Sequence, residues 1–511
     1  MSAQYRYAGC RCRCRLRSRE PVAFGRESGH THQDFRQMRA SPEPQCPIHR
    51  DSTTRAPLAG SAGTWPPGPQ TGITGWKLLQ AMSRDLPGTL TAWRNTYGDI
   101  VHLRIWPEHD VVVANPQLAR ELLVGHHDAL IRWERGIRVF SQVHGHSVLT
   151  AEGENWRGRR HALLPGFSPK AVQRFSPIVV EAATRAFELW PRAHPNWPIE
   201  RELTALTMDV ILQLVFSSSV GEDARAVEHA IRVTSEATNA EFYWPASMPD
   251  WMPWKRKKRR ALRTLKDMID RHIKRRLMMA PAAWPDDLLT RLLQSREDES
   301  KRSLQLVRDE CMTMFLAGHE TTAATLVWWA WCMASNPEAQ SLARDELRRV
   351  LQGNAPSFEA CQEANYLVQT IKEAMRLYPV APMLMSRRAT RAIPLGDWTF
   401  PAGTLFMIPV YALHHDPRWF PDPEKFRPER FAHDAPDLPR GAYIPFGVGP
   451  RVCLGQHLAM AEMTVLASML LLRVKLAVPI DAAPPRPVLN VTLRPDQPMH
   501  LAVTHVNADA N

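Results

Sequence analysis

One cysteine of this 511-residue chain lies in a loop whose composition presents it for chemistry. Residues 446–455 read Phe-Gly-Val-Gly-Pro-Arg-Val-Cys-Leu-Gly, and their glycines and proline exclude a regular helix or strand. A periodic apolar segment follows, for which we predict a helix from about Leu454. The N–H groups and dipole of a helix N-terminus stabilise a thiolate and lower its pKa. Cys453 is therefore predicted to be a metal ligand, in preference to a small buried apolar residue.

A second group of reactive side chains interrupts a long apolar segment. Residues from about 304 to 334 contain no proline, and Asn336-Pro337 should end a helix there. Apolar residues surround this helix, which indicates that it is buried. In its middle, residues 317–322 read Ala-Gly-His-Glu-Thr-Thr. We expect the glycine and threonines to open the helix locally, and Glu320 and Thr321 to hold water and relay protons.

Two further pairs of residues have helical spacing. Trp156 and Arg160 lie four residues apart and should share one helix face. Glu373 and Arg376 lie three apart, just before the helix-ending sequence Leu-Tyr-Pro at 377–379. Taken alone, each pair is typical of a solvated helix surface. Their order relative to the cysteine loop favours a functional interpretation.

Together these segments resemble the cytochrome P450 family of haem-thiolate enzymes. The cysteine loop matches the pattern Phe-x-x-Gly-x-Arg-x-Cys-x-Gly through five residues: Phe446, Gly449, Arg451, Cys453 and Gly455. The run at 317–322 is similar to the signature of the family's oxygen-binding helix. Glu373 to Arg376 resembles its Glu-x-x-Arg element, and 426–431 its Pro-x-x-Phe element. The motifs occur in the expected order, and the resemblance covers about Trp65 to Val506.

The resemblance implies a role for each of these residues. Cys453 would be the axial thiolate ligand of the iron of haem b. Glu320 and Thr321 would deliver protons for O–O cleavage. Four further residues would contact the haem ring: Ala317, Phe446, Gly449 and Gly455. Four others would contact its carboxylates: Trp156, Arg160, Arg387 and Arg451. Arg388 is an open alternative to Arg387. A structural clamp of buried charges would be formed by Glu373, Arg376 and Arg430.

The expected fold is mainly α-helical with small β-sheets, a cytochrome P450 fold organised around the long central helix. We expect a single haem-binding monooxygenase domain over residues 64–508. Within it, residues 100–105 and 110–114 read as two strands joined by a turn at Glu108-His109, and Asn115-Pro116 opens a helix. Residues 1–63 show neither helical nor strand periodicity in their apolar residues, so we expect a disordered basic N-terminal extension. Metal binding or a targeting peptide are the alternatives for that segment.

The net charge of +12 is unevenly distributed. Residues 1–60 contain 11 Arg, no Lys and 5 acidic residues, so they carry +6, half of the excess. Nucleic-acid binding is therefore a poor explanation for the remainder. The basic stretch 254–260 continues with helical apolar spacing and predicts an amphipathic helix with a basic outer face. A weak contact of this face with anionic lipid is the alternative.

Across the body of the chain the eight cysteines show no paired spacing of the Cys-x-x-Cys type, which indicates a reduced, cytoplasmic setting and no disulfide framework. No N-terminal run approaches the roughly 20 apolar residues of a transmembrane segment. The chain thus looks like the soluble, bacterial type of the family, and we expect a monomer.

The resemblance implies a monooxygenase that inserts one atom of O₂ into an apolar organic substrate. Electrons would come from a ferredoxin or flavodoxin with its NAD(P)H reductase, because the chain shows no flavin or iron–sulfur motif. Ala317 and four apolar segments are candidates for the pocket: 131–143, 242–244, 383–385 and 491–493. The alternatives are a peroxide-dependent or isomerising haem-thiolate enzyme, or a non-catalytic haem sensor. The intact Glu320 and Thr321 argue against both.

Overall fold

A computed structural model describes residues 65–506 of the chain, apart from residue 71 and the segments 219–223, 244–251 and 296–300. The predicted extension over residues 1–63 lies outside the described residues. Chain contacts place the described residues in one compact unit. Within the described ranges, no helix combines the length and the apolar character needed to cross a membrane.

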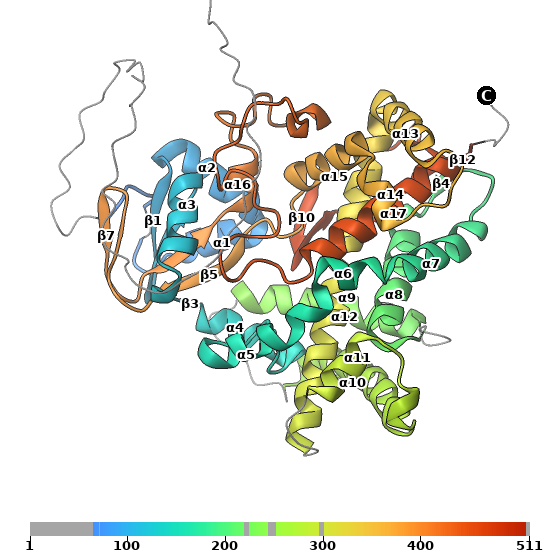
Figure 1. The fold of residues 1–511 in the computed structure, drawn as a ribbon. Helices are drawn as coiled ribbons and strands as arrows, with labels where there is room; N and C mark the ends of the chain where they lie inside the picture. The colour runs from blue at the N-terminus through green and yellow to red at the C-terminus, as the bar shows by residue number, and fades with distance from the viewer. Residues whose placement is uncertain (1–64, 71, 219–223, 244–251, 296–300, 507–511) are drawn as a thin grey trace, which may run out of the picture. The chain divides into compact units, whose positions relative to one another are not determined.

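The central element is helix α12, Lys301–Ser335, shown in yellow in Figure 1. Its apolar residues face inward on several sides, and Trp328 and Trp329 are fully buried. The helix makes its most extensive contacts with α8, Ile199–Phe216, and also packs against α15, Asn365–Leu377. A helix that is apolar all round needs this complete cover, which confirms the prediction of a buried helix.

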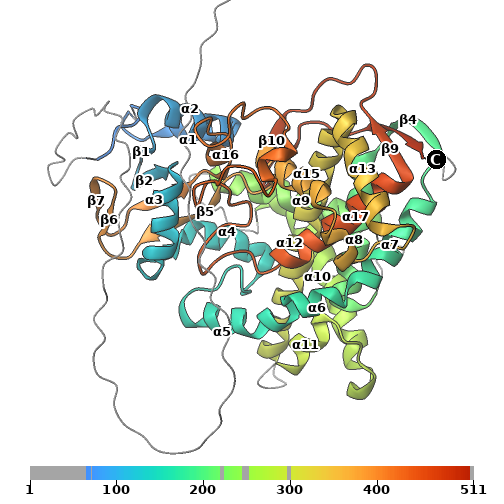
Figure 2. The ribbon, with the colours of Figure 1, turned by 45° about the horizontal axis from the view of Figure 1, so that its top comes forward.

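Several other helices pack against α12. Figure 2 shows α17, Gln456–Arg473, beside α12, with which it is in contact. The remaining α-helices are α1 Trp76–Arg84, α2 Leu86–Tyr97, α3 Pro116–Arg120, α4 Glu134–His144, α5 Gly153–Leu163, α6 Pro169–Gln173, α7 Ser176–Glu188, α9 Ala224–Tyr243, α10 Arg256–Leu277, α11 Leu288–Gln294, α13 Pro337–Leu351, α14 Phe358–Gln362 and α16 Val410–His414.

Helix α10 is the amphipathic helix predicted from the basic stretch, with one difference. Leu262, Leu265 and Ile269 are buried on its inner face, as expected. Lys258 is buried as well, and its Nζ lies 2.7 Å from the Glu241 carboxylate of α9. The basic residues therefore do not all belong to the outer face, because a buried acid on the neighbouring helix offers one of them a partner.

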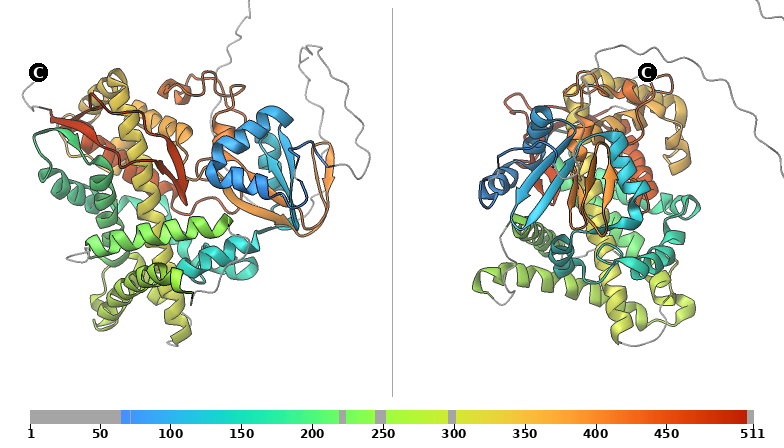
Figure 3. Two further views of the ribbon diagram at one scale, coloured as in Figure 1. Left: turned by 180° about the vertical axis from the view of Figure 1, so that it is seen from behind. Right: turned by 90° about the vertical axis from the view of Figure 1, so that its left-hand side faces the viewer.

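A five-stranded sheet forms a second layer, in the order β1-β2-β8-β5-β3. Its strands are β1 Ile100–Ile105, β2 Glu108–Val113, β3 Leu130–Arg132, β5 Leu384–Ala389 and β8 Leu405–Ile408. The chain turns at Trp106-Pro107, and Glu108 pairs with Ile105, so the turn predicted at Glu108-His109 is wrong by two residues. Apolar residues of α1 and α2 pack on this sheet, and Figure 3 (left) shows both helices in blue beside it.

Three small sheets complete the described fold. β4 Ala193–Trp197, β12 Leu501–His505 and β9 Val474–Ala477 form one, in the order β4-β12-β9. The hairpins β6 Ile393–Leu395 with β7 Trp398–Phe400, and β10 Pro487–Asn490 with β11 Thr492–Pro495, form the other two. The predicted class, mainly α with small sheets, is confirmed.

Candidate active site

The cysteine loop is held rigidly against the segment that follows α3. Gly447 and Gly449 have φ values of 75° and 83°, a region that favours glycine. A Cβ atom on Gly449 would lie 2.4 Å from the backbone oxygen of Leu123, so only glycine allows this approach. The Cys453 N–H donates to the Phe446 carbonyl over 3.0 Å. Helix α17 begins at Gln456, slightly later than predicted, with Cys453 just before its first turn.

Cys453 differs from the other cysteines that the structure describes. Cys311, Cys332 and Cys361 are buried, whereas Cys453 is exposed. Burial nevertheless raises the pKa of the Cys453 thiol, so enough of the chain surrounds this accessible sulfur to disfavour its charged form. The Gly455 N–H and Arg160 lower this pKa in part. The expectation of a net lowering by the helix terminus was wrong because it left out the cost of burying a charge.

Helix α17 also carries a buried carboxyl group that was not predicted. Glu462 is 3% exposed, and its Oε1 has no hydrogen-bond partner. Burial raises the pKa of Glu462 to about 8. The group is therefore protonated in the folded chain at a pH where the unfolded chain would ionise it. This difference destabilises the fold progressively from about pH 4.5 to pH 8 and not below that window.

We expect Glu462→Gln to remove this pH dependence. Relative to wild type, the free energy of unfolding of the variant should rise by about 3 kcal/mol between pH 5 and pH 8. Urea unfolding of both proteins at the two pH values measures the difference. The readout is how the difference in unfolding free energy between the two proteins changes with pH. The buried amide of Gln also lowers stability, but it does so equally at both pH values. Parallel pH profiles would contradict a protonated Glu462.

The centre of α12 presents a second exposed surface deep in the fold. Ala317 is exposed and Thr321 partly exposed, although most of the helix around them is buried. The two residues share one face because they lie four apart. The Thr321 hydroxyl donates to the Ala317 carbonyl over 2.7 Å, the bond to the preceding turn that was expected of threonine.

The predicted local opening of α12 is absent, since residues 301–335 form one continuous helix. A Cβ atom on Gly318 would lie 2.7 Å from Cδ1 of Ile211 in α8. Gly318 therefore allows the two helices to pack closely, which explains a glycine at this position without an opening.

Glu320 is held in a network that sequence reasoning missed. The carboxylate is buried and accepts from the Arg494 guanidinium of β11 over 2.9 Å. The hydroxyls of Ser235 and Thr492 donate to it over 3.3 Å each. Arg494 also donates to Thr492 over 3.1 Å. The acid is thus oriented by α9 and the hairpin, far from it in sequence.

Four arginines gather around one acid near the cysteine loop. Arg451 and Arg132 both pair with Glu152, the latter over 2.6 Å, and Arg451 lies 3.9 Å above the Trp156 ring. Arg160 contacts the same ring at 5.9 Å. Arg387 completes the cluster as the cross-strand partner of Arg132. The predicted Trp156, Arg160, Arg387 and Arg451 are therefore brought together, while Arg132 and Glu152 were missed.

The arginine cluster carries more positive charge than Glu152 can balance. Burial, together with the neighbouring arginines, lowers the pKa of Arg451 to about 9. Burial and Arg132 lower the pKa of Arg387 to about 10. Crowded, partly desolvated guanidinium groups favour additional anions, so this cluster suits a ligand with carboxylates.

Arg388, the alternative to Arg387, points elsewhere. Its guanidinium donates to Glu108 over 2.8 and 2.9 Å and to Glu134 over 2.8 and 3.0 Å. These charge-assisted bonds raise its pKa. Arg388 is thus neutralised by two acids outside the arginine cluster.

The three residues predicted as a clamp lie together in the core. Glu373 and Arg376 are both 0% exposed and form two parallel bonds of 2.7 and 2.8 Å. The Arg430 guanidinium donates to the same carboxylate over 3.1 Å. Arg376 also donates to the His414 carbonyl over 2.9 Å. The network ties α15 to the segment that leads into the cysteine loop.

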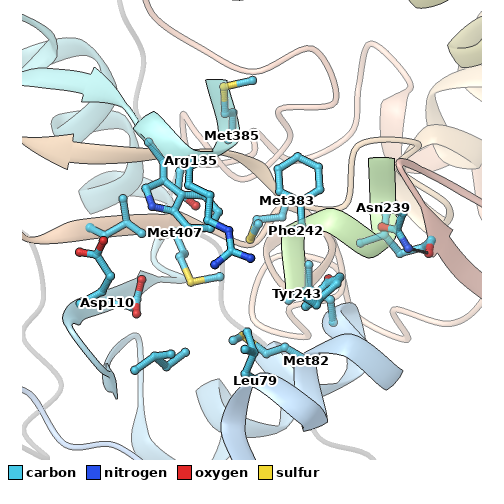
Figure 4. Close-up of a pocket in the computed structure, with 18 of the residues that line it drawn as sticks. Leu79, Met82, Asp110, Arg135, Asn239, Phe242, Tyr243, Met383, Met385 and Met407 are labelled. Atoms are coloured by element: carbon cyan, nitrogen blue, oxygen red, sulfur yellow. Dashed lines mark hydrogen bonds between the residues drawn. The ribbon is translucent and has the colours of Figure 1, made fainter. Parts of the chain in front are cut away.

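A large cavity lies between the sheet and the helices, with a volume of about 1010 Å³ (Figure 4). Its walls come from α1, the turn after β1, α4, the end of α9, residues 381–386 and the β10–β11 hairpin. Of the predicted pocket segments, the residues that line it are Trp133, Arg135, Gly136, Arg138, Phe140, Phe242, Tyr243, Met383, Leu384, Met385 and Val491. Thr492 and Leu493 do not line it. Trp244 lies outside the described residues. Within the described chain, α12 and the cysteine loop contribute nothing to this lining, so Ala317 is not part of it.

The cavity reaches the cysteine loop through one shared residue. Leu384 lines the cavity, and its Cδ2 would lie 3.7 Å from a Cβ atom on Gly447. The turn after β1 and the helix α1 were not predicted as walls, because they approach the other segments only in the folded chain.

The model of the family described as cytochrome P450 matches residues 66–503. The chain belongs to the cytochrome P450 family. It is 30% identical to cyclooctat-9-en-7-ol 5-monooxygenase of Streptomyces melanosporofaciens over 79% of this chain and 88% of the relative. It is 28% identical to cyclooctatin synthase of the same organism, over 91% of this chain and 98% of that relative. A cytokinin hydroxylase of Arabidopsis thaliana is 30% identical to this chain, over 81% of this chain and 82% of that relative. This P450 chain is thus a haem-dependent monooxygenase.

Proposed function

We propose that the chain binds haem b through Cys453 and hydroxylates an apolar organic substrate. The observation that carries this proposal is the pairing of one exposed cysteine, deep in the fold, with the cluster of Arg132, Arg160, Arg387 and Arg451. Haem b offers one iron for a thiolate and two carboxylates for cations. We assign Arg387 to these carboxylates, because Arg388 is occupied by Glu108 and Glu134.

The exposed face of α12 would lie against the haem. Ala317 is small and leaves room for a ring, and Thr321 stands one turn further along on the same side. When bound, the haem supplies the activation of O₂ with two electrons, and the thiolate donates the electron density that favours O–O cleavage.

The protein residues would move the protons that this chemistry consumes. The Thr321 hydroxyl, now bonded to the Ala317 carbonyl, can turn to donate toward the face where Ala317 is exposed. Glu320 would exchange its bond with Arg494 for one to water, accept a proton delivered through that water, and return it to the Thr321 hydroxyl. Ser235 and Thr492 supply further hydroxyls for such a relay.

Separate proteins would supply the electrons, a ferredoxin or flavodoxin with its NAD(P)H reductase. The apolar walls of the cavity support an apolar substrate. The relatives named after cyclooctat-9-en-7-ol and cyclooctatin support the same class.

The test is the reduced, CO-bound absorbance spectrum of the purified chain, followed by O₂-dependent turnover with a surrogate reductase. A thiolate-ligated Soret band and hydroxylated product are expected. A spectrum without that band would refute haem-thiolate ligation. The band without O₂-dependent product from any apolar compound would favour a non-catalytic haem protein.

Thr321→Ala should uncouple electron use from product formation. We expect at least about tenfold less product per NAD(P)H, with hydrogen peroxide released instead, because a positioned proton donor is lost. Product and peroxide are measured in the same reaction. Thr325→Ala is the matched control, since Thr325 makes the same backward bond over 2.9 Å one turn later but is buried. Equal uncoupling in both variants would point to a general disturbance of α12.

A further inference from the structure

The large cavity contains a cationic side chain that its surroundings do not neutralise. Arg135, near the start of α4, lines the cavity and is partly buried. Figure 4 shows its guanidinium in the middle of the cavity, between Met383 and Met407. One N–H donates to the Glu241 backbone carbonyl over 3.2 Å, and the group lies 5.8 Å from the Trp133 ring. Both contacts hold the group in place without supplying a negative charge.

The acidic residues close to Arg135 are committed to other cations. The Glu241 carboxylate lies 2.7 Å from Lys258 and 3.1 Å from Lys255. Glu134, its neighbour in α4, pairs with Arg388 over 2.8 Å. Among the described residues, no carboxylate forms an ion pair with Arg135.

The two acids that line the cavity do not balance this charge either. Glu108 pairs with Arg388 over 2.8 Å. Burial and the nearby Glu108 raise the pKa of Asp110 to about 8, so this carboxyl is mostly protonated at neutral pH. The interior of the cavity therefore has an excess of positive charge centred on Arg135.

We propose that Arg135 binds a carboxylate of the substrate, so that the chain acts on amphipathic carboxylic acids. A guanidinium presents parallel N–H groups that match a carboxylate, and a cation in an apolar cavity gains most from such a partner. This inference rests on the proposed function, because it names the substrate class for the same reaction.

The remaining walls fit the apolar body of such a molecule. Phe140 and Phe242 pack edge to face at 5.2 Å, and Met383 and Met407 add flexible apolar surface. From Arg135 the cavity continues to Leu384, which lies against Gly447 of the cysteine loop. An acid held at Arg135 would extend its apolar end along the cavity toward the proposed haem site, so oxidation should occur away from the carboxyl group.

The test compares carboxylic acids with their own methyl esters in isothermal titration calorimetry with the haem-loaded protein. The panel contains straight-chain, terpenoid and aromatic acids, so that shape alone does not decide the result. For at least one pair, wild type should bind the acid about tenfold to a hundredfold more tightly than the ester. Arg135→Gln should lose this preference and keep its affinity for the ester within about threefold.

Arg138→Gln is the matched control, because Arg138 lies one turn further along α4, also lines the cavity and is exposed. It should keep the acid preference. The inference is overturned if no acid binds more tightly than its ester, if Arg135→Gln keeps the preference, or if both variants lose it equally. The CO-bound spectrum of the same samples tests the proposed function separately, since calorimetry needs no turnover.

Discussion

Replacement of Cys453 by serine is expected to abolish the thiolate-ligated Soret band and to reduce O₂-dependent product formation to background. A serine hydroxyl keeps its proton at neutral pH, whereas a cysteine thiol can ionise and ligate iron. The Gly455 N–H and Arg160, which favour the thiolate, would have no anion to stabilise. The reduced, CO-bound spectrum and product analysis measure the two effects.

A second cysteine variant separates ligand loss from damage to the fold. Cys361 is buried, and the Cys361→Ala variant removes a thiol from α14 without touching the cysteine loop. This variant should be less stable but retain the Soret band. If Cys453→Ser kept the band as well, another residue would have to ligate the iron, and our assignment of Cys453 would be wrong.

Replacement of Glu373 by alanine should prevent stable folding with haem. It would leave Arg376, which is 0% exposed, and Arg430 without their shared carboxylate. Loss of one partner from a buried ion pair costs about 3–5 kcal/mol, against a total stability of about 5–15 kcal/mol for a folded domain. Soluble yield, thermal unfolding and the ratio of haem to protein measure the outcome.

The pair of Asp345 and Arg348 on α13 provides the matched control. It has the same i, i+3 spacing as Glu373 and Arg376, but both side chains are exposed and 3.6 Å apart. Asp345→Ala should change stability by less than about 1 kcal/mol, because water screens this pair. Folded Glu373→Ala protein with full haem content would show that the clamp is not needed.

Much of this fold follows from patterns that are local in the chain. The apolar run and the Asn-Pro stop located α12 to within a few residues, because helix formation depends on neighbours three and four positions apart. The strand β1 and the clamp helix α15 followed in the same way. Cys453 and Thr321 were found by motif, whereas Arg132 and Glu152 belong to no motif and were missed.

The tertiary structure decided which charges meet. Arg387 and Arg388 are adjacent in β5, and successive side chains of a strand point to opposite faces. Their order in the chain does not reveal that one face holds Arg132 and the other Glu108. The partner of Glu320, Arg494, lies 174 residues away, and no local pattern predicts that contact.

For Cys453, too, some properties follow from the local sequence and others only from the tertiary structure. Its loop, glycines and following helix were predictable because they depend on backbone conformations of neighbouring residues. The pKa of its thiol was not, because desolvation depends on how much of the distant chain surrounds the sulfur. The sequence alone thus determined the cysteine as the candidate iron ligand and the long central helix as the candidate carrier of the proton-relay residues. Folding decided the electrostatic environment of both, since charge interactions act through space between segments far apart in the chain.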